Sequence, residues 1–297
     1  MFYTFARPDQ ADGDRCSAEL PAAGGSRILT FCTHAAFSKD SADAIELPVA
    51  SDTRLVYLSS VGDVGGLTPN RRALLISPLS NLTRADTIGR LPFMSSSGQA
   101  MGYLGSLAWL NDHELIYAGF RVDYVQPAPF SQVRDTLLTG VEIGRIDVSG
   151  AQPVFTTVPQ TDLASSVSAT PDGKTIYYTK NGESVVYRQN LTTGAVQVAH
   201  DFGATGIARD VQVFENDLIA IVGDSISYTN DPTFGFITRD FGGKLIEVDL
   251  TSGVETDLTF PAMEHRRPAL SPDGSHLALE ARPLQNRKTD IWVLEQP

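Results

Sequence analysis

The chain has little positive charge, few cysteines and no long apolar run. Its 297 residues contain 23 lysines and arginines against 35 aspartates and glutamates, which gives a formal net charge of −12. Such a surface repels a phosphate backbone, so nucleic acid is excluded as a favoured partner. No stretch reaches the about 18 apolar residues of a membrane-spanning helix. The first residues also lack the basic and apolar regions of a signal peptide.

The two cysteines, Cys16 and Cys32, leave two interpretations open. As a disulfide they would close a short loop and contribute roughly 3 kcal/mol through chain entropy. As free thiols they would be small core residues. A disulfide would favour an oxidising, extracytoplasmic compartment, and free thiols would be compatible with the cytoplasm.

Motifs of common enzyme chemistry are missing. The nucleophile elbow Gly-x-Ser-x-Gly is absent, and Ser95–Gly98 (SSSG) is interpreted as a flexible linker. There is no phosphate-binding loop or dinucleotide fingerprint, and the histidines show no metal-ligand spacing. We therefore expect no catalytic residue, no cofactor and no metal site, and we predict that the protein is not an enzyme.

Two short stretches are near-copies of each other, namely Ser168–Tyr178 (SATPDGKTIYY) and Ala269–Leu279 (ALSPDGSHLAL). Each predicts a strand, a Pro-Asp-Gly turn and a second apolar strand. Proline presets φ at the second turn position, aspartate caps nearby amides, and glycine accepts the exit geometry. Weaker copies of the pattern occur at Val49–Tyr57, Ala108–Tyr117 and Val211–Ala220.

These copies predict a repeated four-stranded unit. Third strands follow the second strands, and three of them lead through a small-residue hairpin to a fourth strand. No convincing helical period interrupts the pattern. Recurrence at about 40–60 residues with four strands per unit is typical of propeller blades. The second strands are predicted to begin near Leu55, Leu115, Ile176, Leu218 and Leu277.

We therefore expect one all-β domain over residues 1–297, a β-propeller with four-stranded antiparallel blades. Residues 46–297 hold five recognisable blades, and residues 1–45 form an irregular N-terminal segment with a closing strand or a partial blade. We expect six blades in all, with five as the alternative. Because the last strand set stops at its third strand, Phe2–Phe5 or Arg27–Phe31 would supply the missing one.

The repeat resembles a known family. Ser271–Gly274 (SPDG) with the later strand Asp290–Leu294 (DIWVL) is similar to the TolB-type β-propeller repeat, and Thr170–Gly173 with Val186–Asn190 is the second good match. The resemblance covers about two blades, and no additional TolB-type N-terminal domain is visible. It implies a six-bladed propeller, which often serves as a protein-interaction platform in the bacterial periplasm. It implies no activity, because the same blade occurs in hydrolases and lyases.

The long insertions all fall between second and third strands. Because such connections leave a meander on one side, we expect them to gather on one face of the propeller, which we call the loop face. Aromatic residues with arginines are the types favoured at protein interfaces. The insertions are Ser60–Arg72, Arg121–Thr139, Ser225–Gly243 and Ala281–Asp290. The candidate partner-binding residues are Arg121, Tyr124, Phe130, Tyr228, Phe234, Phe236, Arg239 and Phe241.

Three functions are consistent with this pattern. The favoured hypothesis is a non-catalytic scaffold that docks on a protein partner, as an accessory subunit at the extracytoplasmic side of a larger complex, including a membrane-associated one. The first alternative is a metal-assisted lyase or hydrolase that uses the central channel. It would bring together His200, Asp201, Glu264 and His265. The second alternative is a propeller that binds a small ligand, either a sugar or a peptide.

Overall fold

The structure is a computed structural model of the chain. It describes residues 2–6, 15–19, 28–32, 44–61, 71–81, 84–125, 135–203, 206–223, 227–231, 236–240, 243–270, 274–283 and 290–295. These ranges contain 26 β-strands and no α-helix. The described residues therefore include no helix that is long and apolar enough to cross a membrane.

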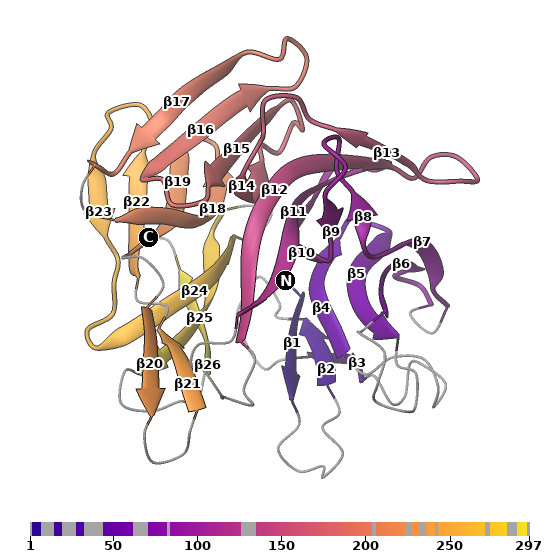
Figure 1. The fold of residues 1–297 in the computed structure, drawn as a ribbon, viewed down its shortest axis with the longest axis horizontal. Helices are drawn as coiled ribbons and strands as arrows, with labels where there is room; N and C mark the ends of the chain where they lie inside the picture. Colours follow the sequence, from indigo (N-terminus) through magenta and orange to yellow (C-terminus); the bar gives the residue numbers. More distant parts are fainter. Residues whose placement is uncertain are drawn as a thin grey trace.

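The strands form a β-propeller with five antiparallel blades in chain order (Figure 1). The first blade contains β4 (Ala44–Ala50), β5 (Arg54–Val61), β6 (Arg71–Pro78) and β7 (Asp86–Arg90). The second contains β10 (Tyr103–Asn111), β11 (Glu114–Val125), β12 (Asp135–Asp147) and β13 (Val154–Thr157). The third contains β14 (Ala164–Ala169), β15 (Thr175–Lys180), β16 (Val185–Asn190) and β17 (Val196–Asp201).

The last two blades depart from this simple order. The fourth contains β18 (Ile207–Phe214), β19 (Asp217–Gly223), β22 (Lys244–Asp249) and β23 (Glu255–Asp257). A separate hairpin, β20 (Ser227–Asp231) with β21 (Phe236–Asp240), is inserted between its second and third strands. The fifth blade has three described strands, β24 (Met263–Leu270), β25 (His276–Pro283) and β26 (Asp290–Glu295).

The N-terminal residues form a sheet of their own. It consists of β1 (Phe2–Ala6), β2 (Arg15–Glu19) and β3 (Ile28–Cys32), and β1 contacts β4 of the first blade. Because β1 and β3 both pair with β2, neither strand completes the fifth blade as we had expected. The five-blade alternative therefore describes the propeller, with this three-stranded sheet beside it.

The hydrophobic core lies in layers between neighbouring blades. Val56 and Leu74 of the first blade pack with Leu104 and Ile146 of the second, and all four are fully buried. Similar clusters join the second to the third blade, the third to the fourth and the fourth to the fifth. Burying one such side chain contributes about 1.5–3 kcal/mol. The second strands are buried on both faces, so their apolar residues hold each blade against its neighbours.

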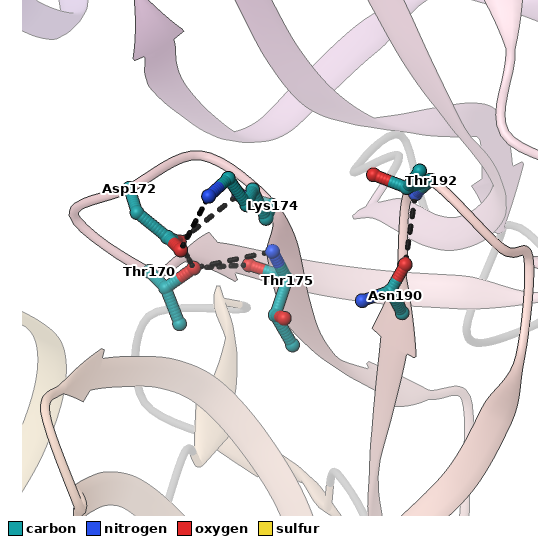
Figure 2. Close-up of polar contacts among 6 residues, drawn as sticks. All are labelled: Thr170, Asp172, Lys174, Thr175, Asn190 and Thr192. Carbon is teal, nitrogen blue, oxygen red and sulfur yellow. Dashed lines mark hydrogen bonds and ion pairs between the residues drawn. The ribbon is translucent and has the colours of Figure 1, made fainter.

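The Pro-Asp-Gly turn of the third blade has the local chemistry predicted from its sequence (Figure 2). The Asp172 carboxylate accepts hydrogen bonds from the Thr170 hydroxyl at 2.7 Å and from the Lys174 N–H at 3.1 Å. The Thr170 hydroxyl also bonds to the backbone of Thr175. Gly173 has a φ of +66°, which residues with a Cβ rarely adopt. These hydrogen bonds lower the pKa of Asp172.

The hairpins between third and fourth strands are also stabilised by a side-chain oxygen that accepts hydrogen bonds from backbone N–H groups of the turn. In the third blade, the Asn190 side chain accepts a hydrogen bond from the Thr192 N–H at 2.9 Å (Figure 2). It also accepts one from the Thr193 N–H at 2.9 Å. In the fourth blade, Asp249 accepts from the equivalent Thr251 and Ser252. Asn190 and Asp249 thus stabilise these turns by the same side-chain-to-backbone hydrogen bonds.

Ser95–Gly98 is an ordered turn, so the prediction of a flexible linker is wrong. It connects β8 (Phe93–Met94) to β9 (Ala100–Met101), a hairpin between the first two blades. The Ser96 N–H and hydroxyl both donate to the carboxylate of Glu142 on β12. Glu142 lies far away in the sequence, so the local Ser-Ser-Ser-Gly pattern gave no sign of this anchor.

Candidate functional site

The loop face is built by the connections between second and third strands. They join β5 to β6, β11 to β12, β19 to β22 and β25 to β26, as the repeat predicted. Because equivalent strands of successive blades run in the same sense, these connections leave the ring on one side. Figure 1 shows the start of β12 and the β20–β21 hairpin together at the lower side of the molecule.

The structure places five of the eight candidate partner-binding residues on strands. Arg121 and Tyr124 lie on the extended β11, opposite Thr139 and Thr136 of β12. Arg121 is exposed to solvent.

The other three lie on the inserted hairpin. Tyr228 and Arg239 occupy directly opposed positions on β20 and β21, and Phe236 is opposite Asp231. The remaining candidates, Phe130, Phe234 and Phe241, lie outside the described residues.

The cysteine pair occupies a defined position in the N-terminal sheet. Cys16 on β2 and Cys32 on β3 are direct cross-strand partners. Opposed residues of antiparallel strands have Cα separations of about 4.5–5.5 Å, which is within the range that a disulfide spans. The register is therefore compatible with the disulfide, which stays a prediction.

The residues expected to converge in a channel enzyme lie apart. His200 and Asp201 are on β17, the outermost strand of the third blade, whereas Glu264 and His265 are on β24, the innermost strand of the fifth. His200 Nε2 instead contacts Glu255 Oε1 of β23 at 2.8 Å and links two neighbouring blades at the rim. Among the described residues, no group of three or more histidine, cysteine, aspartate or glutamate side chains could hold a metal. His200 and Asp201 directly precede the fourth blade in the sequence, but this position did not predict whether they face the channel.

His265 is a buried structural residue. Its side chain is fully inaccessible to solvent, and Nε2 accepts a hydrogen bond from the Phe260 N–H at 3.2 Å. Burial lowers the pKa of His265, and this effect exceeds the opposing influence of Gly243, Asp257 and Glu264. The imidazole is therefore held neutral, as an acceptor for the chain that enters the fifth blade.

This burial predicts that stability falls in mild acid. The unfolded chain protonates His265 near its ordinary pKa of about 6.5, before the folded protein does, so protons favour the unfolded state as pH decreases below that value. The limiting slope is about 1.4 kcal/mol per pH unit for one such group. Urea unfolding between pH 8 and pH 5 should show this slope in the wild type and a flatter one in His265→Gln. An equal slope in both proteins would contradict this assignment.

The channel-facing strands share a feature that sequence reasoning missed. Every innermost strand contains a β-bulge or register shift. In β4, β18 and β24 it lies near the middle of the strand and holds a non-glycine residue at positive φ, with values of 50°, 48° and 45°. Such backbone carries a local cost and turns side chains away from the regular alternation. The three residues are Leu47, Asp210 and Arg267.

Arg267, in the bulge of β24, interacts with residues of several blades. Its N–H donates to Asp210 of the fourth blade at 3.3 Å, and its guanidinium donates to Glu280 of β25 at 3.1 Å. Enclosure by protein lowers the pKa of Arg267, but Glu280, Tyr103 and Asp210 raise it by more. Tyr103 belongs to the second blade, so Arg267 faces the centre of the ring. No motif marks this residue, because its neighbours come from three blades.

The comparisons with known proteins agree on the architecture. No family model matches the sequence, and no characterised protein matches it in sequence. TolB from Acinetobacter baumannii is similar in structure, with a TM-score of 0.59 and 15% identity over 99% of this chain. The fold is that of TolB-type β-propellers. This confirms the resemblance at the level of the fold.

The similar structures differ in what they do. The chain spans 64% of the length of the Acinetobacter TolB. It is also similar to a putative TolB from Agrobacterium tumefaciens, with a TM-score of 0.54, 11% identity, and coverage of 91% of this chain and 81% of that one. A gluconolactonase from Xanthomonas campestris gives a TM-score of 0.54 and 12% identity, over 97% of this chain and 83% of that one. The shared fold thus occurs in proteins of different function.

Proposed function

We propose that the protein is a non-catalytic propeller that binds a protein partner through its loop face, as an accessory subunit of a larger extracytoplasmic complex. The main support is the placement of all four insertions at equivalent connections. At one of them β11 and β12 are prolonged, and another carries the separate β20–β21 hairpin. A rigid ring that presents long connections on one side is a typical binding scaffold. The similarity in fold to two TolB structures is consistent with this function.

The chemistry of the described loop-face residues fits a protein partner. Tyr228 and Arg239 are paired across the β20–β21 hairpin, and tyrosine and arginine are enriched among the residues that dominate binding energy. Arg121 adds a second positive charge from β11 in a chain whose net charge is −12. A partner surface with carboxylates and an apolar centre would complement this set.

The experiment compares partner capture by two charge-reversal variants. Affinity-tagged wild type, an Arg121→Glu/Arg239→Glu double variant and a Lys174→Glu control are used as baits in native membrane extracts, followed by quantitative mass spectrometry. Lys174 is a matched control, since it lies in a first-to-second-strand turn on the opposite side of the ring. We expect the double variant to capture at least about tenfold less of the specific partner than the wild type does.

The control variant and the fold decide the outcome. All three proteins should melt at similar temperatures, because Arg121 and Lys174 are exposed and Arg239 lies on a hairpin outside the blade sheets. If the loop-face variant retained every partner of the wild type, or if Lys174→Glu lost the same partners, the loop face would not be the binding surface.

A further inference from the structure

The outer strand β13 differs from the other outer strands in its charge. Blade edges normally carry charged residues, which prevent unwanted strand pairing. Among the blades, β7, β17, β23 and β26 each contain at least one aspartate or glutamate. In contrast, β13 reads Val154-Phe155-Thr156-Thr157, within a stretch from residue 148 to residue 161 that has no charged residue.

A second uncharged stretch lies against β13. Residues 91–111 also lack charges, and they include the β8–β9 hairpin. The Phe93 ring of β8 contacts the Phe155 ring with centroids 4.8 Å apart. Met94, Val154 and Phe155 are exposed by 64%, 56% and 40%, which is unusual for large apolar side chains grouped on two adjacent elements. We call the surface formed by Phe93, Met94 and Val154–Thr157 the neutral edge.

The backbone of the neutral edge offers hydrogen-bonding groups to a further strand. β13 pairs with β12 alone among the described strands. The Val158 N–H donates to the Ile143 carbonyl of β12 at 2.9 Å. Because hydrogen bonding alternates along an antiparallel strand, the N–H and C=O groups of Phe155 and Thr157 point away from β12.

We propose that the neutral edge pairs with the neutral edge of a second copy of this chain. An antiparallel register centred on Thr156 places Phe155 of each copy opposite Thr157 of the other, so the outward backbone groups of both strands are satisfied. It also creates aromatic–threonine and threonine–threonine pairs, which are favourable across strands. Copies of a chain with a net charge of −12 repel each other, so contact is favoured where charge is absent.

The flanking prolines limit the strength of this contact. Pro153 and Pro159 have no N–H, so the strand ladder ends close to β13. We therefore expect a reversible dimer with a dissociation constant of about 1–100 μM rather than a permanent one.

The test uses opposite charges at the symmetry axis. Thr156 is exposed and faces itself in the proposed dimer, so Thr156→Asp places two negative charges together and Thr156→Lys places two positive charges together. Sedimentation velocity from about 1 to 300 μM should show a monomer–dimer equilibrium for the wild type and at least about tenfold weaker association for each variant. An equimolar mixture of the two variants should restore association, which a misfolded protein would not do.

Thr256 provides the matched control. It is an exposed threonine in the middle of β23, and Thr256→Asp and Thr256→Lys should leave association unchanged. A wild type that stays monomeric over the whole range, a dimer that Thr156 substitutions do not weaken, or a mixture that stays dissociated would overturn the proposal. If the wild type stayed monomeric and the Thr156 substitutions abolished its binding to a different protein, the neutral edge would be the binding surface for that protein instead.

Discussion

Gly173→Ala is expected to destabilise the propeller by about 3–5 kcal/mol, whereas Gly182→Ala should cost only about 1 kcal/mol. Both glycines have positive φ, at +66° and +75°, so the backbone penalty of a Cβ is similar at both positions. They differ in their surroundings. A Cβ on Gly173 would lie 2.1 Å from the carbonyl oxygen of Leu110, whereas a Cβ on Gly182 meets nothing within 4 Å.

The contact at Gly173 joins two blades. Leu110 is the second-last residue of β10, the innermost strand of the second blade, so the Pro-Asp-Gly turn of the third blade packs directly onto its neighbour. A backbone carbonyl cannot rotate away as a side chain can, and relief requires the two blades to separate locally. This separation would disturb the apolar layer beneath the turn.

Urea unfolding of the two variants and the wild type measures this difference directly. The expected result is a much lower midpoint for Gly173→Ala with an unchanged slope, since the unfolded chains are alike. Equal losses in the two variants would show that the turn does not depend on its contact with Leu110, and that only its backbone conformation requires glycine.

The Pro-Asp-Gly turn also shows which features of the fold can be predicted from the sequence. Proline, aspartate and glycine act on bonds within a few residues, so the turn and its flanking strands were predictable. The predicted second-strand starts at Leu55, Leu115, Ile176, Leu218 and Leu277 all lie in second strands of the structure. The packing of Gly173 on Leu110 was not predictable, because no local pattern encodes a distance between blades.

The errors have the same physical origin. The number of blades depends on which strands β1 and β3 pair with, and a local sequence pattern does not specify that pairing. The alternative of a channel enzyme placed His200 in the channel from its position in the repeat, but the structure puts it on an outer strand. The polar residues around Arg267 come together only when the ring is formed.

Glu142→Ala is the second substitution with a large expected effect, a loss of about 3 kcal/mol in the free energy of unfolding. The Glu142 side chain is almost completely buried, yet its carboxylate is well satisfied. Its oxygens accept from the Ser96 N–H at 3.1 Å, the Ser96 hydroxyl at 2.6 Å and the Thr157 hydroxyl at 2.9 Å. Alanine would remove these hydrogen bonds to a charged acceptor, and a hydrogen bond of this kind contributes about 1.5–3 kcal/mol.

Glu114→Ala serves as the control in the same blade. Glu114 is a partly exposed glutamate that pairs with Arg145, and a pair of this kind contributes at most about 1 kcal/mol. If Glu114→Ala and Glu142→Ala destabilised the protein equally, the buried carboxylate would have no special structural role.

A local measurement separates this anchor from general destabilisation. Burial, together with the charge of Glu142, raises the pKa of Tyr117, so removing that charge should lower this pKa. Hydrogen exchange should also accelerate first at Ser96 and its neighbours, because the β8–β9 hairpin loses its link to β12 and β13. Acceleration spread evenly over all blades would instead indicate global unfolding, and the hairpin would not depend on Glu142 for its position.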